Sequence, residues 1–268
     1  MKNIIKKIKP LYFILNKIRH FKIEIIFTNI HYFICLVLKK PYFGKKYGAN
    51  IQSKKEREIL RRLVKQVQNL KENIKCLEIG SWAGCSAVTI AETIKKSGKG
   101  GMLYCIDVWR GTDENIKITK GKVSASAIFN LFKHNVKYSG VENYIIPIQM
   151  TSDEFAEKEK DTQFDFIYID GDHKYTQAKK DFINYFNILE IGGIMCGDDL
   201  DYFSDQIDEN LAKENREKDF VTDKEGRTYH AGVTLAVKDV WNNKVGMRHS
   251  IWSIQKTKDG WIPYNYSS

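Results

Sequence analysis

The sequence predicts an α/β protein with a doubly wound, mostly parallel sheet that has helices on both faces. Short strand-like runs alternate with helical runs, and the strand-like runs are apolar almost throughout. Apolar strands joined by helices are typical of parallel sheets that are buried on both faces. The chain has 268 residues, 43% of them hydrophobic and only 4 of them Pro. This length suffices for one large domain and an appendage.

The predicted helices and strands of the main domain begin at residue 53. Apolar residues recur at helical spacing over 53–69, and a short apolar strand follows at 75–80. The pattern then predicts helix 84–96, strand 102–107, helix 124–138, strand 144–150, strand 164–170, helix 175–189, strand 193–197, helix 230–241 and strand 251–256. The polar stretch 201–227 has little periodicity, so we expect a loop or a helix there, beside the functional site.

The N-terminal quarter differs from the rest of the chain in charge. Residues 1–75 hold 19 Lys and Arg against 4 Asp and Glu, whereas residues 76–268 hold 24 against 29. A basic segment can lie on an anionic membrane face or on an acidic partner as well as on nucleic acid, and we expect no nucleic-acid partner. We divide the chain into a basic, aromatic, helical extension over 1–52 and a main domain over 53–268. The extension is a cap over the site, an oligomerisation arm or a membrane-surface helix.

Nothing in the extension predicts secretion or a membrane span. The apolar run 11–15 ends in polar residues without a small-residue cleavage site, and the stretch 21–38 contains Lys22, Glu24 and His31. The five cysteines form no CxxC pair, which predicts buried free thiols in a reducing compartment. We therefore expect a cytoplasmic protein, with peripheral contact at the inner membrane face as an addition.

Glycines and acids at the ends of the first two strands predict a nucleotide-type cofactor site. The string from Glu78 to Gly84 lies at a strand-to-helix turn, where glycine lets the backbone approach a ligand and a helix N-terminus faces it. Asp107, at the end of the second strand, is placed to accept hydrogen bonds from both hydroxyls of a ribose. The glycine spacing is not the GxGxxG of dinucleotide-binding proteins, which disfavours NAD.

The motif Glu78-Ile79-Gly80 with Gly84, followed by Asp107, resembles that of class I S-adenosylmethionine-dependent methyltransferases. The resemblance implies a Rossmann-like sheet of seven strands and S-adenosylmethionine as the cofactor. It implies the following cofactor contacts: Glu78, Gly80, Ser81, Gly84, Ser86, Asp107, Ser152 and Asp170. For Ser152 the alternative is a helix N-cap. Trp82 and Trp109 either form a wall of the cofactor site or pack in the core.

Acidic residues follow two further strands. Strand 164–170 runs into Asp170-Gly171-Asp172-His173, and Asp198-Asp199 follow the fifth strand. Carboxylates at neighbouring strand ends build a reactive or metal-binding site in an open α/β sheet. Three such carboxylates repel one another unless they are protonated or neutralised. Oxygen ligands without a cysteine partner suit Mg²⁺ or Mn²⁺ rather than zinc.

The Asp170-Gly171-Asp172-His173 string resembles the methyltransferase group that includes macrolide and aminocoumarin sugar O-methyltransferases and cephalosporin-hydroxylase-like proteins. The resemblance covers residues 50–256. This group is similar to the catechol and caffeoyl-CoA O-methyltransferases, which implies a divalent cation on Asp170, Asp198 and Asp199. The catechol enzyme has Asn where this chain has Asp199, which leaves more than one coordination pattern open.

His173 stands where the catechol enzyme has its basic lysine, and the resemblance implies His173 and Asp170 as the catalytic residues. A neutral imidazole is well suited to take a proton from a hydroxyl near pH 7. Asp172 is the rival base, and a purely structural His173 is the alternative. For His230 we expect a capping or surface role rather than contact with the acceptor.

Taken together, these resemblances predict a metal-assisted O-methyltransferase whose acceptor is a hydroxyl of a small molecule or a glycan. Two other classes stay open. One is an NAD-linked oxidoreductase on the same scaffold, and the other is a non-catalytic cofactor-binding partner protein of a biosynthetic cluster. Homo-oligomerisation is a further expectation. The sequence carries no readable code for the acceptor.

Overall fold

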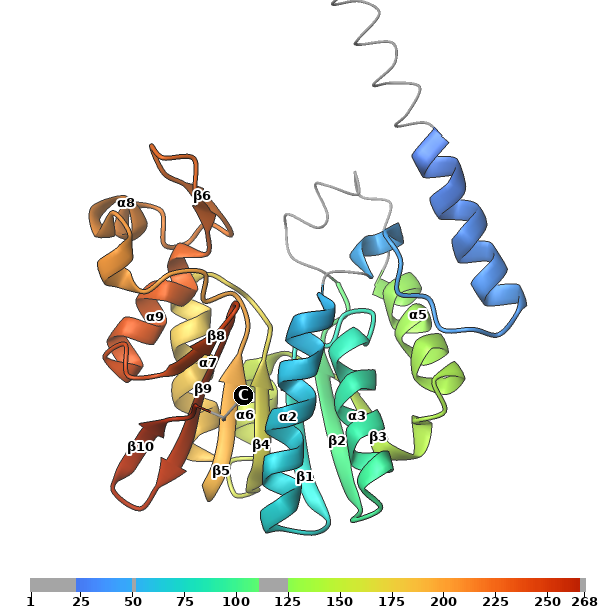
Figure 1. The fold of residues 1–268 in the computed structure, drawn as a ribbon, viewed down its shortest axis with the longest axis horizontal. Coiled ribbons are helices and arrows are strands. Elements are labelled where there is room, and N and C mark those ends of the chain that lie inside the picture. The colour runs from blue at the N-terminus through green and yellow to red at the C-terminus, as the bar shows by residue number, and fades with distance from the viewer. Residues whose placement is uncertain (1–22, 50–51, 111–124, 266–268) are drawn as a thin grey trace, which may run out of the picture.

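The computed structural model describes residues 23–49, 52–110 and 125–265, and its central sheet confirms the predicted α/β fold (Figure 1). The sheet is built from β1 (Ile74–Ile79), β2 (Gly101–Asp107), β3 (Ile145–Gln149), β4 (Phe164–Ile169), β5 (Leu189–Gly197), β8 (Gly246–Arg248), β9 (Ile251–Thr257) and β10 (Gly260–Pro263). Seven strands follow one another in the order β10-β9-β5-β4-β1-β2-β3, and β8 pairs with β9. The pairs among β1 to β5 are parallel, whereas β9 pairs antiparallel with its neighbours.

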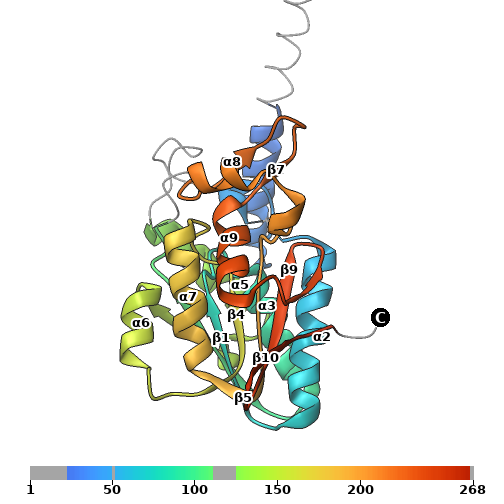
Figure 2. The same ribbon diagram turned by 90° about the vertical axis from the view of Figure 1, so that its left-hand side faces the viewer.

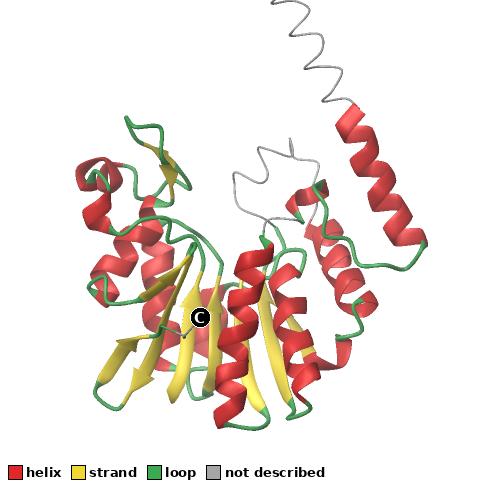
Figure 3. Cartoon of the chain, in the orientation of Figure 1, coloured by secondary structure: helices red, strands yellow, loops and turns green. Residues whose placement is uncertain are grey.

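Helices cover both faces of the sheet (Figures 2 and 3). The helices are one over residues 23–37, α2 (Lys54–Leu70), α3 (Cys85–Ser97), α5 (Ala125–Tyr138), α6 (Ser152–Lys158), α7 (Tyr175–Asn187), α8 (Glu209–Glu214) and α9 (Ala231–Trp241), with short 3-10 turns η1 (Lys46–Gly48), η2 (Glu142–Tyr144) and η3 (Ser204–Gln206). Side chains of α2, α3 and α5 form one core with the sheet, and side chains of α6, α7 and α9 form the other. A small hairpin of β6 (Val221–Thr222) and β7 (Thr228–Tyr229) lies outside the sheet.

The alternation of side chains along the strands explains why these apolar runs are continuous. In β1, Cys76 belongs to the core under α2 and α3, and Leu77 belongs to the core under α7 and α9. The same alternation holds for Phe166 and Ile167 in β4. Since successive residues of a strand point to opposite faces, a strand buried on both sides favours apolar residues at most positions. All five cysteines are buried free thiols, as predicted.

The predicted elements need correction at the end of α7, at the start of β5, which begins at Leu189 rather than at residue 193, and at two short strands. Helix α7 ends at Asn187, and Leu189 already pairs with Phe164, so the predicted end at residue 189 is wrong. Leu189 is fully buried, and its place in the sheet core stops the helix. The pattern also missed β8 and β10, which are only three and four residues long. The polar stretch 201–227 contains η3, α8 and β6, and Ser124 of the predicted helix 124–138 lies outside the described residues.

The strand order reverses beside β1, whose neighbours are β2 and β4. Open α/β sheets bind their ligands at the carboxyl ends of the strands beside such a reversal. The residues after β1, β2, β4 and β5 therefore meet at one edge of the sheet.

Candidate functional site

Gly80 brings the end of β1 against the end of β4. Its φ angle is +87°, and a Cβ atom there would lie 1.9 Å from the carbonyl oxygen of Asp170. The sequence predicted that this glycine admits a ligand, but its nearest neighbour is the chain's own backbone. Gly84, also at positive φ, precedes the first residue of α3. The two glycines thus shape the turn that carries the amino end of α3 to the site edge.

Glu78 is a fully buried carboxyl group at the end of β1. Its Oε2 accepts hydrogen bonds from Ser81 Oγ at 2.5 Å and from Cys105 Sγ at 3.5 Å. Within the described part of the chain, its Oε1 is buried and has no hydrogen-bond partner. Burial raises the pKa of Glu78 to about 7, although the hydrogen bond from Ser81 opposes the shift. An unpartnered buried oxygen costs stability unless a ligand or a proton satisfies it.

We expect Glu78→Gln to remove a pH dependence of stability. Between pH 4.5 and about 7 the folded protein holds a proton on Glu78 that the unfolded chain has lost, so stability falls as pH rises through this window. The loss is about 3 kcal/mol, because one pKa unit corresponds to about 1.4 kcal/mol. The glutamine does not titrate, so the variant does not lose this free energy of unfolding. Urea unfolding at a series of pH values, without cofactor, measures the gain of the variant over wild type.

The control for this prediction is Glu72→Gln, which replaces an exposed glutamate just before β1. It should run parallel to wild type across the same pH range. A gain for the Glu78 variant that is equal at pH 4.5 and pH 7.5 would contradict the prediction.

Asp107 ties the loop after β1 to the loop after β2. One carboxylate oxygen accepts the backbone N–H of Trp82 at 2.7 Å, and the other accepts that of Trp109 at 2.5 Å. Burial raises the pKa of Asp107, and these amides oppose the shift. Both tryptophans have positive φ, which is costly for bulky residues and gathers at functional sites. Trp109 is fully buried against Phe129 and Phe132, so it packs in the core, whereas Trp82 is half-buried.

The serines predicted to contact the cofactor lie in three different settings. Ser81 binds Glu78, and Ser86 is buried in the first turn of α3. Thr151 caps α6 by accepting the N–H of Glu154, so the alternative in which Ser152 caps this helix is wrong. Ser152 instead accepts a hydrogen bond from Gln177 at 3.1 Å.

Two of the three predicted metal ligands converge on one phenol. Tyr168 Oη lies 3.2 Å from Asp170 Oδ2 and 3.3 Å from Asp198 Oδ2, and it accepts a hydrogen bond from Gln52 at 2.7 Å. A phenol has a single proton, so it cannot donate to both carboxylates at once. Asp198 also accepts the hydroxyl of Ser250 and the backbone N–H of Asp199.

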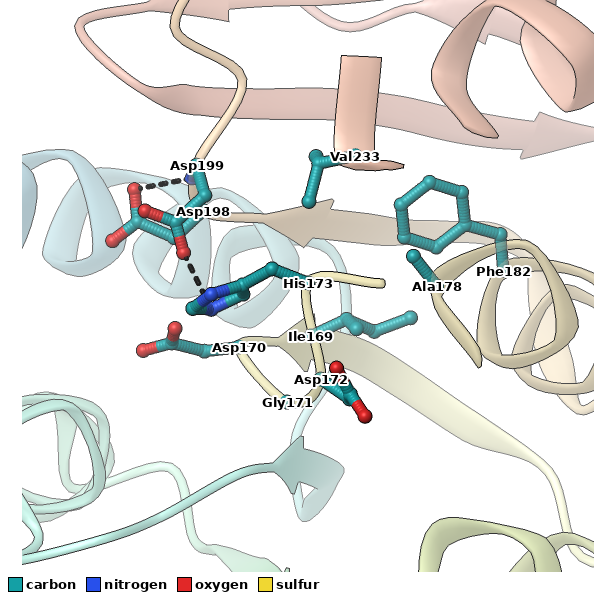
Figure 4. Close-up of a pocket in the computed structure, with 10 residues that line it drawn as sticks. All are labelled: Ile169, Asp170, Gly171, Asp172, His173, Ala178, Phe182, Asp198, Asp199 and Val233. Carbon is teal, nitrogen blue, oxygen red and sulfur yellow. Dashed lines mark hydrogen bonds and ion pairs between the residues drawn. The ribbon is translucent and has the colours of Figure 1, made fainter. Parts of the chain in front are cut away.

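Asp199 turns toward a pair of histidines. Its Oδ2 lies 2.9 Å from Nε2 of His173 (Figure 4). The Nδ1 of His173 lies 2.6 Å from Asp219. His230 Nδ1 lies 2.9 Å from Asp201 and 3.5 Å from Asp199, and the two imidazole rings are 4.6 Å apart. His230 is therefore part of this cluster, and the capping or surface role predicted for it is wrong; it makes no side-chain cap of α9.

The electrostatics of the cluster reflect crowded carboxylates. Burial raises the pKa of Asp170 well above its usual value, and Asp198 and Asp199 add to the shift. Burial and Asp199 raise the pKa of Asp198 to about 7. Burial alone would lower the pKa of His173, but Asp199 and Asp219 raise it well above the usual value for histidine. Carboxylates crowded together in this way favour a cation between them.

One small pocket is lined by the carboxylates that follow β4 and β5 and by the neighbouring histidine. Asp170, His173, Asp198 and Asp199 line it, and the side chain of Asp172 points away from the other three carboxylates (Figure 4). Asp172 accepts the backbone N–H of Lys174 at 3.0 Å, within its own turn. Among the described residues, His173, Asp199 and His230 offer ligand atoms that all lie within 4.8 Å of one another. This group shares only Asp199 with the predicted set.

Sequence reasoning missed several members of the site. It assigned no role to Tyr168, Asp201, Asp219 or Ser250. Tyr168 was an interior position of an apolar strand, and Asp219 lies in a polar stretch without periodicity, 46 residues after its partner His173. Only the position of that stretch beside the site pointed to Asp201 and Asp219.

Residues 77–200 match a family model whose description is a methyltransferase domain. This chain contains a methyltransferase domain. The match begins within β1 and ends just after Asp199, so it includes the glycine turn and the carboxylates of Asp170, Asp198 and Asp199, whereas Asp219 and His230 lie beyond it. None of the curated proteins compared with the chain matches it.

Solved structures agree with the fold of this methyltransferase domain. The O-methyltransferase from Bacillus cereus in complex with SAH is 13% identical, covers 85% of this chain and 90% of its own, and has a TM-score of 0.51. TomG from Streptomyces achromogenes, an O-methyltransferase involved in tomaymycin synthesis and solved with SAM, is 12% identical. It covers 76% of this chain and 81% of its own, with a TM-score of 0.50. At these identities the likeness shows the fold.

Proposed function

We propose that the protein is an S-adenosylmethionine-dependent, divalent-metal-assisted O-methyltransferase. The observation that carries the proposal is the convergence of Asp170 and Asp198 on a single phenol inside a methyltransferase domain. These half-buried carboxylates lie at the ends of adjacent parallel strands. The two similar structures, described with SAH and with SAM, support the choice of cofactor.

The loops after β1 and β2 supply groups that fit the cofactor. Asp107 is fixed by two backbone amides, and each of its carboxylate oxygens keeps a lone pair for a ribose hydroxyl. The unpartnered Oε1 of Glu78 is a second acceptor at the same edge of the sheet. Gly80, Ser81, Gly84, Ser86, Ser152 and Asp170 are the remaining proposed contacts. When bound, S-adenosylmethionine supplies an activated methyl group on a sulfonium, which is already a good leaving group.

Asp170, Asp198 and Asp199 are the proposed ligands of Mg²⁺ or Mn²⁺. All three supply oxygen, which these hard cations prefer, and their mutual repulsion is relieved by positive charge. When bound, the cation would orient the acceptor hydroxyl and lower its pKa.

His173 is the proposed base. Asp199 is the main cause of the raised pKa of His173, and a cation held by Asp199 would oppose that rise. The neutral imidazole would then take the proton of the acceptor hydroxyl at Nε2, the atom that now contacts Asp199, while Asp219 accepts from Nδ1 and fixes the ring. Asp172 is the weaker candidate because its carboxylate is turned away and binds the amide of Lys174. His230 borders the same ring and would position it.

The proposed acceptor is a hydroxyl of a sugar, a glycan or another small molecule. The support is the resemblance of Asp170-Gly171-Asp172-His173 to the sugar O-methyltransferase group. We also propose that the protein acts in the cytoplasm.

Calorimetric titration tests the proposal. We expect S-adenosylhomocysteine to bind the full-length protein, and NADH not to bind. With S-adenosylmethionine present, methyl transfer to members of a panel of nucleotide sugars and glycans should require Mg²⁺ and stop with a chelator. Tight binding of NADH without binding of S-adenosylhomocysteine would refute the proposal in favour of an oxidoreductase. Binding of S-adenosylhomocysteine with turnover that survives chelation would refute the metal assignment alone.

A further inference from the structure

The helix over residues 23–37 has one face that contacts the body and one that does not. On the first face, Tyr32 packs edge-on against Tyr42, with ring centroids 5.1 Å apart, and Cys35 is buried. Asn29 accepts a hydrogen bond from Lys46 at 2.9 Å, and Glu24 pairs with Lys45. These contacts fix which side of the helix faces outward.

The outward side is an apolar stripe. Its members recur at the spacing of one helix face, and each is between 39% and 66% exposed: Ile23, Ile26, Phe27, Ile30, Phe33, Ile34, Val37 and Leu38. Among the described residues, none buries this stripe, whereas the apolar faces of α2 and α7 are buried in the two cores. A contiguous exposed stripe of this kind marks a surface that binds a partner or a membrane.

The segment that follows the helix is attached firmly to the domain. The side chain of Asn135 in α5 accepts the N–H of Tyr42 at 2.7 Å and donates to the carbonyls of Tyr42 and Ala83, each at 2.9 Å. The indole of Trp82 donates to the carbonyl of Tyr47 at 2.7 Å. The helix is therefore tied to the loop after β1, and the orientation of the stripe is set by the domain.

We propose that this stripe seats the protein on an anionic lipid surface. Charge favours lipid over a second copy of the chain, because residues 1–40 contain nine Lys and Arg against the single acid Glu24. Two such segments would repel each other, whereas each basic residue near an anionic bilayer adds attraction. Lys39 and Lys40 are exposed directly after the stripe. An apolar face with adjoining basic residues is the pattern of helices that lie in the membrane interface.

The helix would lie on the membrane rather than cross it. Within the described ranges, no helix is both long enough and apolar enough to span a bilayer. The helix projects past the carboxyl ends of the parallel strands, the edge that carries the candidate site (Figure 1). Docking would therefore hold that edge close to the lipid surface. The binding proposal stands apart from the proposed function, and its test measures binding alone.

Vesicle flotation with the full chain tests the proposal. We expect binding to vesicles that contain phosphatidylglycerol, weak binding to phosphatidylcholine alone, and loss of binding as salt is added. The double substitution Phe27→Glu with Phe33→Glu should weaken binding at least about tenfold, since it removes two large apolar side chains and adds two negative charges. The matched control is Leu70→Glu with Ile183→Glu, which changes two exposed apolar residues on helices α2 and α7. The control should bind like wild type.

Thermal unfolding should be the same for both double variants and wild type, because all four side chains are exposed. Wild-type protein that fails to float with anionic vesicles would overturn the proposal, and so would a Phe27/Phe33 variant that binds as tightly as wild type. A wild-type dimer that ignores vesicles and becomes a monomer in this variant would overturn it in favour of self-association.

Discussion

Asp198→Ala is expected to lower metal-dependent methyl transfer at least about a hundredfold, since a bound cation stabilises developing charge by several kcal/mol. Asp198 lies at the end of β5, where its Oδ2 shares the phenol of Tyr168 with Asp170. Its loss removes one proposed ligand and leaves the glycine turn intact. Affinity for S-adenosylhomocysteine should therefore change little. Steady-state assays with Mg²⁺ and calorimetric titration measure the two effects separately.

The control for this substitution is Asp161→Ala, which removes an exposed aspartate before β4. It should leave turnover and cofactor affinity unchanged. An Asp198 variant that keeps wild-type turnover would refute the metal assignment. A variant that loses cofactor affinity in parallel would instead indicate that the carboxylate supports the fold of the site.

We expect Gly80→Ala to destabilise the domain more than any other substitution that adds a single methyl group. Its Cβ would overlap the carbonyl oxygen of Asp170 at 1.9 Å, and its φ of +87° already disfavours any side chain. The conformational cost is about 1–2 kcal/mol, and forcing the ends of β1 and β4 apart adds about 1–3 kcal/mol. Urea unfolding measures the sum, and affinity for S-adenosylhomocysteine should fall with it.

Gly192→Ala separates these two costs. Gly192 has nearly the same φ, +86°, but nothing lies within 4 Å of a Cβ there. It should therefore lose only the conformational part. Equal losses in the two variants would show that the contact between Gly80 and Asp170 contributes nothing, contrary to the close packing of β1 against β4.

The sheet was predictable because its signal is local. Residues such as Leu77 and Phe166 lie in runs where nearly every side chain is buried, and that pattern depends on neighbours in the sequence. The end of α7 was not predictable in this way, because Leu189 leaves the helix to pair with Phe164, 25 positions earlier. Short strands such as β8 carry too few residues to form a pattern.

In the candidate site, too, the predictable part is the part that depends on local sequence. The closeness of Asp170 and Asp198 was predictable, because strand ends of a parallel sheet meet at one edge. The partners of His173 were not, since Asp219 comes from an irregular stretch and His230 from the start of another helix. The role of Tyr168 was not predictable, because an aromatic residue inside a buried strand is typical of the core. Its hydroxyl nevertheless reaches the site.

The central claim is that the carboxylates at the ends of β4 and β5 hold the cation of a methyltransferase. Anomalous diffraction from crystals grown with Mn²⁺ and S-adenosylhomocysteine tests it most directly. We expect one anomalous peak within about 2.5 Å of oxygen atoms of Asp170, Asp198 and Asp199. A peak held by His173 and His230 without Asp170 and Asp198, or no peak beside a bound cofactor, would contradict it.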